Sequence, residues 1–309
     1  MVSNNRSQWP SAYRRLAICL LIACAVITSG CSSNRLAYRY ADWAVVWWVE
    51  DYLTLNEDQS HQLQTDLDRL VRWHCQVELP RYAQWLRRLE QDLQPEVADR
   101  AVLQHHQQQL SDFLPPLLER LGEPASRLLA SLSETQVEEL AANMESRHRE
   151  LQSEYLLASP EKTGQARAER IQERAERWLG SLNRQQQDIV AQWAINRGAQ
   201  TRIWLDGRRK WQEAFLASLA SRHSAGFTAR LGHLIEHSEE ARGARYRAMT
   251  SDSRSALVDL NYRLLLNADQ RHWQHLRAEV AGLREDVEAL ACGNAMTADQ
   301  LDVAPQGRS

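Results

Sequence analysis

The segment HLIEH, residues 233–237, has the spacing of a zinc-binding motif. On a helix, His233 and His237 would share one face and could bind Zn²⁺ at about 2.0–2.1 Å, with Glu236 as the general base. Hydrolases of this type need a third protein ligand on a large mixed α/β scaffold, and this chain shows no strand pattern. We therefore interpret the segment as a solvated helix, predict no metal and no cofactor, and keep a zinc hydrolase only as an alternative.

Few other residues suggest catalysis. His105 and His106 are adjacent, so on a helix they point about 100° apart and are poorly placed to chelate one ion. We expect both of them at the surface. The sequence contains no G-x-S-x-G nucleophile elbow, phosphate-binding glycine loop or dinucleotide fingerprint. It therefore predicts no catalytic residue and a protein that is not an enzyme.

The first thirty residues predict export. Arg6, Arg14 and Arg15 precede an uncharged apolar run that ends at Gly30. That run is about 15 residues long, shorter than the roughly 20 that a membrane-spanning helix needs. Residues 1–30 are therefore interpreted as a signal peptide rather than a permanent anchor.

Cys31 has the context of a lipidated cysteine. It follows the small residues Ser29 and Gly30, and lipoprotein processing recognises a cysteine in that position. We expect diacylglycerol on its thiol and, after cleavage of the leader, a further acyl chain on its amino group, which together hold the protein on a membrane. Cys24 fits the same pattern but would leave an apolar region of only about eight residues. Because Ser32 rather than an aspartate follows, the expected destination in a Gram-negative bacterium is the outer membrane.

Two cysteines, Cys75 and Cys292, remain outside the leader and the lipidation site. Thiols exported to an oxidising compartment tend to pair, and a bridge closing so long a loop would stabilise the fold by about 4 to 5 kcal/mol. The alternative is two unrelated buried thiols, since the sequence does not bring the two alpha carbons within bonding reach. We favour the disulfide and keep the alternative open.

The charge of the chain is nearly balanced. It has 37 Lys and Arg residues against 40 Asp and Glu residues, and loss of the leader with its three arginines would leave 34 against 40, a net charge of −6. The two signs are interspersed, and no basic run is longer than GRRK at residues 207–210. Such a cluster is typical of a solvated helix face, so we predict no nucleic-acid partner.

Apolar residues recur with a helical period. The clearest seam begins at Trp273 and ends at Leu290, with gaps of 3, 4, 3, 4 and 3. We predict an all-α fold, an extended multi-helix bundle of about nine or ten helices without a sheet. It comprises one helical lipoprotein domain, residues 31–292, and residues 293–309 are expected to form a disordered tail. The predicted helices span residues 35–54, 57–78, 80–93, 95–121, 134–158, 161–180, 184–222, 225–240, 243–265 and 268–291.

One five-residue pattern occurs four times: LNEDQ at 55, LSETQ at 132, LNRQQ at 182 and LNADQ at 266. It predicts helix N-termini, because Asn or Ser can cap the free amides and Gln three residues later can bond back. The expected capping residues are Asn56, Ser133, Asn183 and Asn267, with Gln59, Gln136, Gln186 and Gln270.

The same letters resemble the L-T-x-x-Q signature of small helical periplasmic chaperones and envelope-stress regulators. In this chain Asn or Ser stands where that family has Thr. The resemblance implies a chaperone-like periplasmic binder of unfolded or lipidic clients. We keep it as an alternative to capping.

Large rings cluster just after Cys31. Leu36, Tyr40, Trp43 and Trp47 are spaced by 4, 3 and 4, which places them on one face of a helix, and Trp48 extends that stripe sideways. We expect the stripe to pack into the core of the bundle. The alternative is contact with the headgroup region of a membrane, where tryptophan is favoured.

Two stretches resemble a known family: RLAYRYADWAVVWWVEDYLTLNEDQ, shortly after Cys31, and RWHCQVELPRYAQWLRRL at 72–89. They are similar to proteobacterial lipoproteins catalogued as a domain of unknown function. In that family a lipidated cysteine precedes a Tyr- and Trp-rich helix that ends in an acidic pair and a tyrosine, here Glu50, Asp51 and Tyr52. The resemblance implies an all-helical fold and lipidation, and it supplies no catalytic residues.

Together these features predict a lipoprotein anchored to the periplasmic face of the outer membrane. Its expected role is structural or one of protein interaction in the cell envelope. The expected partners are the membrane, through the lipid on Cys31, and a further envelope protein.

Overall fold

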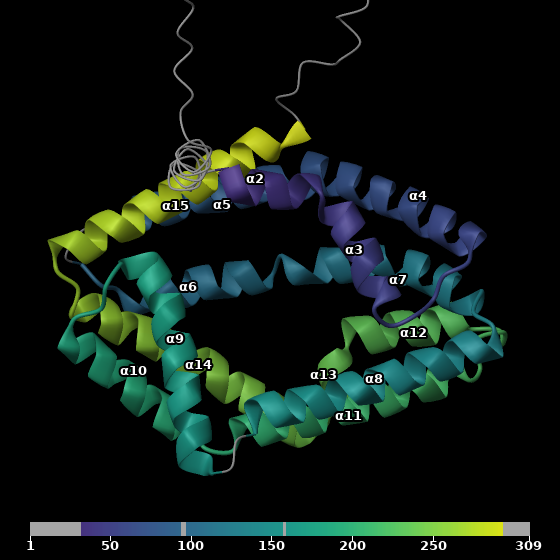
Figure 1. Ribbon diagram of the computed structural model, residues 1–309. Helices are drawn as coiled ribbons and strands as arrows, with labels where there is room; N and C mark the ends of the chain where they lie inside the picture. The colour runs from purple at the N-terminus through teal and green to yellow at the C-terminus, as the bar shows by residue number, and fades with distance from the viewer. Residues whose placement is uncertain (1–31, 94–96, 157–158, 293–309) are drawn as a thin grey trace, which may run out of the picture.

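The computed structural model describes residues 32–93, 97–156 and 159–292 (Figure 1). The predicted leader and the predicted tail lie outside these ranges. The regular elements within them are all helical, and no strand occurs in the part described. This confirms the predicted fold class. The elements are α2 (Ser32–Arg39), α3 (Ala41–Glu50), α4 (Glu57–Trp73), the π-helix η1 (His74–Glu78), α5 (Leu79–Asp92), α6 (Arg100–Ser111), α7 (Leu114–Ala130), α8 (Glu134–Tyr155), α9 (Pro160–Leu179), α10 (Arg184–Asn196), α11 (Gln200–Leu219), α12 (Phe227–Glu236), α13 (Ser238–Arg242), α14 (Ala244–Leu266) and α15 (Gln270–Leu290).

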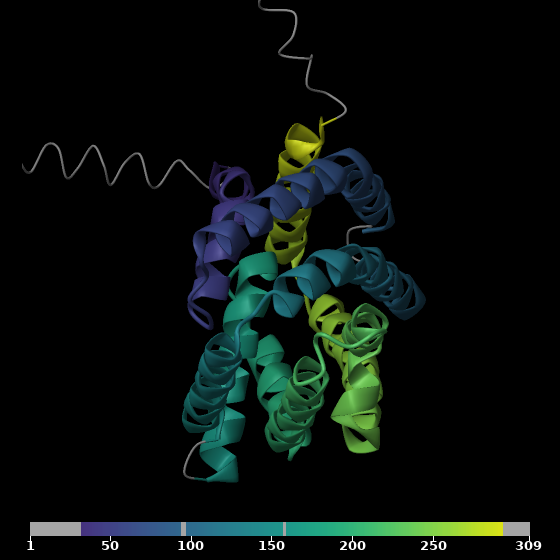
Figure 2. The ribbon, with the colours of Figure 1, turned by 90° about the vertical axis from the view of Figure 1, so that its right-hand side faces the viewer.

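The helices are stacked in layers. In Figure 1, α4, α5 and α15 run along the upper side, α6 and α7 cross the middle, and α8 and α11 run along the lower side. The helix pairs with the most extensive contacts are α5 with α15, α9 with α10, and α7 with α12. Segments from opposite ends of the sequence therefore lie side by side. Figure 2 shows α2 and α3, in purple, on one side of this body.

Most of the buried apolar side chains belong to two cores. Trp273 and Val280, which belong to the predicted seam, are buried in the first core. Full burial of a large apolar side chain stabilises the fold by about 1.5–3 kcal/mol. The first core contains Leu86, Leu93, Leu179, Leu182, Ile189, Val190, Leu260, Leu264, Leu265, Trp273 and Val280. The second contains Leu53, Leu132, Leu140, Met144, Phe215, Leu219, Phe227 and Leu231.

Several predicted helices are each divided in two. The segment 184–222 breaks between α10 and α11, where Gly198 has a φ of 43°, a left-handed conformation that favours glycine. The segment 35–54 breaks at Tyr40, and the segment 225–240 breaks at His237, which has a φ of −107°. The hydrophobic period continues across such breaks, so it does not reveal them.

The helix predicted for residues 95–121 differs from the structure at both ends. It begins at Arg100, stops at Ser111 and resumes at Leu114 as α7, which continues through Pro124 to Ala130. Pro124 removes one backbone donor from the helix. α7 packs against α12, and Gly122 of α7 lies close to Gly232 of α12.

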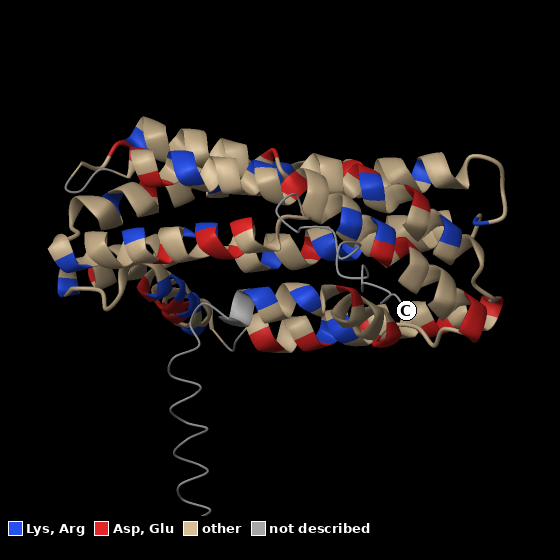
Figure 3. Ribbon diagram, turned by 90° about the horizontal axis from the view of Figure 1, so that it is seen from above, with Lys and Arg blue, Asp and Glu red and all other residues tan. Residues whose placement is uncertain are grey.

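Charged residues of both signs alternate over the helices (Figure 3). This distribution agrees with the interspersed charges of the sequence. None of the helices in the described ranges is both long enough and apolar enough to cross a bilayer.

Candidate functional site

Of the cysteines that we singled out, two are described by the structure. Cys75 and Cys292 form a disulfide, with their alpha carbons 5.2 Å apart. The bridge ties η1 to the chain just after α15. Cys31, the predicted lipidation site, lies outside the described residues and directly precedes Ser32, the first residue of α2.

Ion pairs reinforce the connection that the disulfide makes. Arg284 Nε of α15 lies 2.8 Å from Glu90 Oε2 of α5. Arg35 Nε of α2 lies 2.7 Å from Asp286 Oδ1 of α15, and the Asp286 side chain is buried. The beginning and the end of the described chain are therefore held together by charge pairs as well as by a covalent bond.

Five large side chains on α2, on α3 and at the break between them are exposed, and together we call them the aromatic surface: Leu36, Tyr40, Trp43, Trp47 and Trp48. Trp43 is 64% exposed, and Trp47 and Trp48 are each 59% exposed. The rings of Trp43 and Trp47 stack with their centroids 6.3 Å apart. The expectation that this stripe packs into the core is therefore wrong.

The opposite face of the same two helices holds them to the body. Arg35 contacts Asp286, and Tyr38 Oη lies 2.9 Å from His74 Nδ1. Gln64 Nε2 of α4 donates to Asp42 Oδ2 of α3 at 3.1 Å. Because polar residues occupy the docked side, the apolar stripe faces outward, away from the rest of the protein.

A groove of about 650 Å³ lies between α4 and α7 and extends to η1; we call it the α4–α7 groove. The π-helical turn leaves Val77 42% exposed and buries Glu78 beside it. Such turns are rare and often occur at functional sites. The groove is lined by Asp66, Arg69, Leu70, Trp73, Val77, Glu78, Pro116, Glu119, Arg120, Glu123, Pro124 and Arg127.

The buried acids of this groove are paired with arginines. Asp66 is buried, and its Oδ1 lies 3.3 Å from Arg127 Nη2 of α7. Arg81 donates two hydrogen bonds to the Glu78 carboxylate, at 2.7 and 2.9 Å. The Arg120 guanidinium lies 5.1 Å from the ring centroid of Trp73, within cation–π range. The groove therefore offers apolar and aromatic surface together with charges of both signs.

The repeated five-residue pattern forms joints between helices. Asn56 and Gln59 form a capping box at the start of α4, and Ser133 and Gln136 form one at the start of α8. Gln59 Nε2 also donates to the backbone oxygen of Ser131, at the end of α7. Each glutamine thus completes the capping box of its own helix and also donates a hydrogen bond to a neighbouring segment.

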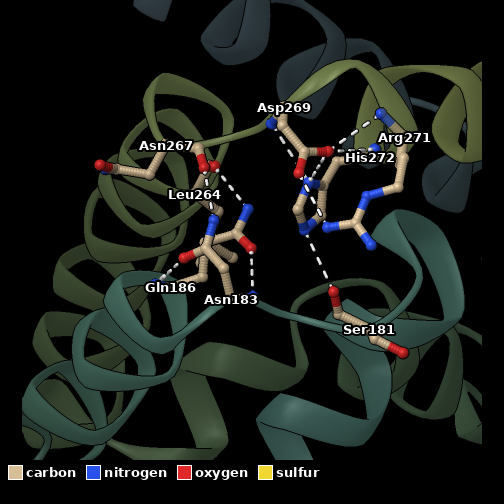
Figure 4. Close-up of polar contacts among 8 residues, drawn as sticks. All are labelled: Ser181, Asn183, Gln186, Leu264, Asn267, Asp269, Arg271 and His272. Carbon is tan, nitrogen blue, oxygen red and sulfur yellow. Dashed lines mark hydrogen bonds and ion pairs between the residues drawn. The ribbon is translucent and has the colours of Figure 1, made fainter.

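The second joint lies at the other end of the molecule, where α10 and α15 begin on the left of Figure 1. Figure 4 shows Gln186 Nε2 donating to the Leu264 oxygen at 3.0 Å and Asn183 Nδ2 donating to the Asn267 oxygen at 2.8 Å. The α10 capping box therefore also satisfies carbonyls at the end of α14, which a helix C-terminus leaves without partners.

The fourth copy of the pattern does not form the predicted cap. Asn267 is the C-cap of α14, because that helix extends through Leu266. Asp269 caps α15 instead, and His272 takes the place that we assigned to Gln270 (Figure 4). The hydrogen bond from the Arg271 guanidinium holds the pKa of the Asp269 carboxyl well below its usual range.

The two histidines of the HLIEH segment lie near each other. His233 and His237 have ring centroids 4.6 Å apart at the end of α12. His233 Nε2 lies 3.5 Å from Glu240 Oε2. Throughout the described ranges, no three His, Cys, Asp or Glu side chains form a group that could hold a metal ion.

The expected surface position of His106 is wrong. We expected both adjacent histidines at the surface, and His105 is exposed, but His106 is buried. Its Nε2 lies 3.0 Å from Asp92 Oδ2, and its ring contacts Trp85 edge to face. Burial lowers the pKa of His106, although Asp92 partly opposes this effect. The position is buried because it faces α5.

Comparison with known proteins identifies a family. The chain matches a family of unknown function (DUF6279) over residues 51–247, well over half of its length. Searches of the curated proteins and of the solved structures gave no match. The expectation of an uncharacterised family is thus confirmed. The match begins after the aromatic surface, so it leaves out Cys31 and the first part of the first resembling stretch but covers the second, residues 72–89.

Proposed function

The chain belongs to this family, and because the function of the family is unknown we propose a role from the residues themselves. It is a lipoprotein anchored through Cys31 to the periplasmic face of the outer membrane. Its role in the cell envelope is structural or one of protein interaction, without a catalytic step. Its protein partner binds in the α4–α7 groove.

The observation that carries the proposal is the Cys75–Cys292 disulfide. Disulfides persist in oxidising compartments such as the bacterial periplasm and are rare in the cytosol. The bridge supports export, as does the leader. Lipidation is supported by the position of Cys31 after Ser29 and Gly30.

The interaction role is supported by the composition of the α4–α7 groove. Trp73 and Val77 provide apolar surface, while Arg120 and Arg69 provide charge. Aromatic residues and arginine are enriched at protein interfaces, where they contribute much of the binding energy. A segment that carries both apolar and charged side chains would complement this lining.

Intact mass spectrometry of the protein extracted from a Gram-negative host tests the anchor. The expected mass lacks residues 1–30 and includes the acyl chains. The Cys31→Ala variant should keep the leader and gain no acyl chain. The Cys24→Ala variant is the matched control and should be processed like the parent. Normal processing of Cys31→Ala would overturn the proposed anchor.

Photo-crosslinking in intact cells tests the groove. A photoreactive residue replaces Val77 in the groove, and in a second variant it replaces Ile195, which is 66% exposed on α10. A discrete protein adduct is expected at position 77 alone, and Arg120→Glu should abolish it. Equal adducts at both positions, or an adduct unaffected by Arg120→Glu, would contradict binding in this groove.

A further inference from the structure

The aromatic surface is largely exposed. Residues 43–49 of α3 are seven consecutive apolar residues, and no residue of α3 is buried. A helix that is apolar on all sides is ordinarily buried in a core or a membrane. Exposed apolar patches on this scale mark surfaces that contact another molecule.

The patch is directed outward by the way in which its helices are attached. Arg35, Tyr38 and Asp42 hold one face of α2 and α3 to the body. Leu36, Tyr40, Trp43 and Trp47 are each more than half exposed, so they do not belong to this docked face. Polar contacts therefore hold the patch in position, and the attachment of α2 and α3 to the body does not require burial of its side chains.

We infer that the aromatic surface lies in the headgroup region of the bilayer that carries the lipid anchor, as a second and noncovalent attachment. This inference rests on the proposed lipidation of Cys31. That residue directly precedes α2, and Leu36 is only five residues further along the chain. Acyl chains on Cys31 would bring the start of α2 to the membrane surface, and the patch would lie within reach of the lipids.

The chemistry of the patch favours a lipid surface. Tryptophan and tyrosine concentrate where headgroups meet acyl chains, because their rings are both apolar and able to donate a hydrogen bond. The exposed Arg39, beside Tyr40, adds a positive charge that anionic phospholipids attract. Attachment at both the lipid and the patch would fix the orientation of the body relative to the membrane.

Fluorescence quenching tests this contact. The full chain is expressed in a Gram-negative host and extracted, and its acylation is checked by intact mass. It is then reconstituted into phosphatidylethanolamine–phosphatidylglycerol vesicles whose acyl chains carry bromine, which quenches nearby tryptophans. The parent protein should be quenched. The variant with Trp43→Phe, Trp47→Phe and Trp48→Phe should lose most of that quenching, whereas Trp178→Phe, which removes a 37% exposed tryptophan on α9, should keep it.

The outcomes separate this inference from the proposed function. Acylated protein that shows equal quenching in the parent and the triple variant would overturn the membrane contact and leave the anchor intact. Protein without acyl chains would overturn both. A dimer of the acylated parent in detergent that the triple variant dissociates, without quenching in vesicles, would assign the patch to a second copy of the chain and overturn the inference.

Discussion

The side-chain amides of Gln59 and Gln136, 77 residues apart, hydrogen-bond each other in both directions. Gln136 Nε2 donates to Gln59 Oε1 at 2.7 Å, and Gln59 Nε2 donates to Gln136 Oε1 at 3.2 Å. Each oxygen also accepts the backbone N–H of its own N-cap residue, Asn56 or Ser133. Two helix N-termini are thereby joined through their capping boxes.

Gln59→Ala should destabilise the protein by about 2 kcal/mol, because it removes half of a capping box and leaves buried polar groups without partners. Urea unfolding of the purified protein measures this loss. Gln270→Ala is the matched control, since Gln270 has the equivalent position in the fourth pattern but is exposed and outside the capping box. Its effect should stay within about 0.5 kcal/mol. Equal losses in the two variants would show that the joint contributes no stability.

The double variant Cys75→Ser and Cys292→Ser should lose about 4 kcal/mol of stability, because the bridge closes a loop with a sequence separation of 217 residues. Reducing agent should produce the same loss in the parent and none in the variant. Chemical unfolding with and without reductant measures both effects. A parent protein insensitive to reductant would contradict a structural role for the bridge.

The helical period predicted an apolar stripe just after Cys31, but not what that stripe contacts. Leu36, Tyr40, Trp43 and Trp47 are all exposed, and the break at Tyr40 divides the predicted helix into α2 and α3. An apolar stripe has the same spacing whether it meets a core or another molecule. Polar contacts such as that between Asp42 and Gln64 attach these helices to the body and leave the stripe exposed. Because Gln64 lies on another helix, the sequence around the stripe does not predict this contact.

The five-residue pattern predicted the N-cap residue correctly at three of its four occurrences. Asn56, Ser133 and Asn183 are the caps that the sequence predicted. At the fourth, α14 extends over Leu266, and the cap moves to Asp269. Local capping chemistry thus fixes a helix start only when the preceding helix leaves the segment free. The α4–α7 groove could not be predicted, since it depends on packing between helices far apart in the chain.

Arg222→Met should cost about 2–3 kcal/mol. Its guanidinium is buried, and its Nε donates to the Leu132 oxygen at 2.9 Å while Nη2 reaches Glu134 Oε1 at 2.7 Å. Removing it leaves a buried carbonyl without this partner beside the α8 cap. Arg209→Met is the control, because Arg209 and Glu145 form a solvent-exposed ion pair, which should contribute much less to stability. The two variants are compared by thermal and urea unfolding, and an equal loss in both would contradict the special role of Arg222.

Stability should fall as the pH drops below 6.5, in part because of His148. This side chain is buried, and its Nδ1 has no hydrogen-bond partner within the described part of the chain. Burial, and then the nearby Arg209 charge, lower the pKa of His148 from its ordinary value of 6.5. The unfolded chain therefore takes up this proton first as the pH falls through 6.5, which favours unfolding until the folded-state pKa is passed. His148→Gln should reduce the pH dependence of the unfolding free energy between pH 7.5 and 5, measured in urea, while His105→Gln, at an exposed position, should not. An unchanged pH dependence in His148→Gln would show that this histidine is not part of the acid sensitivity.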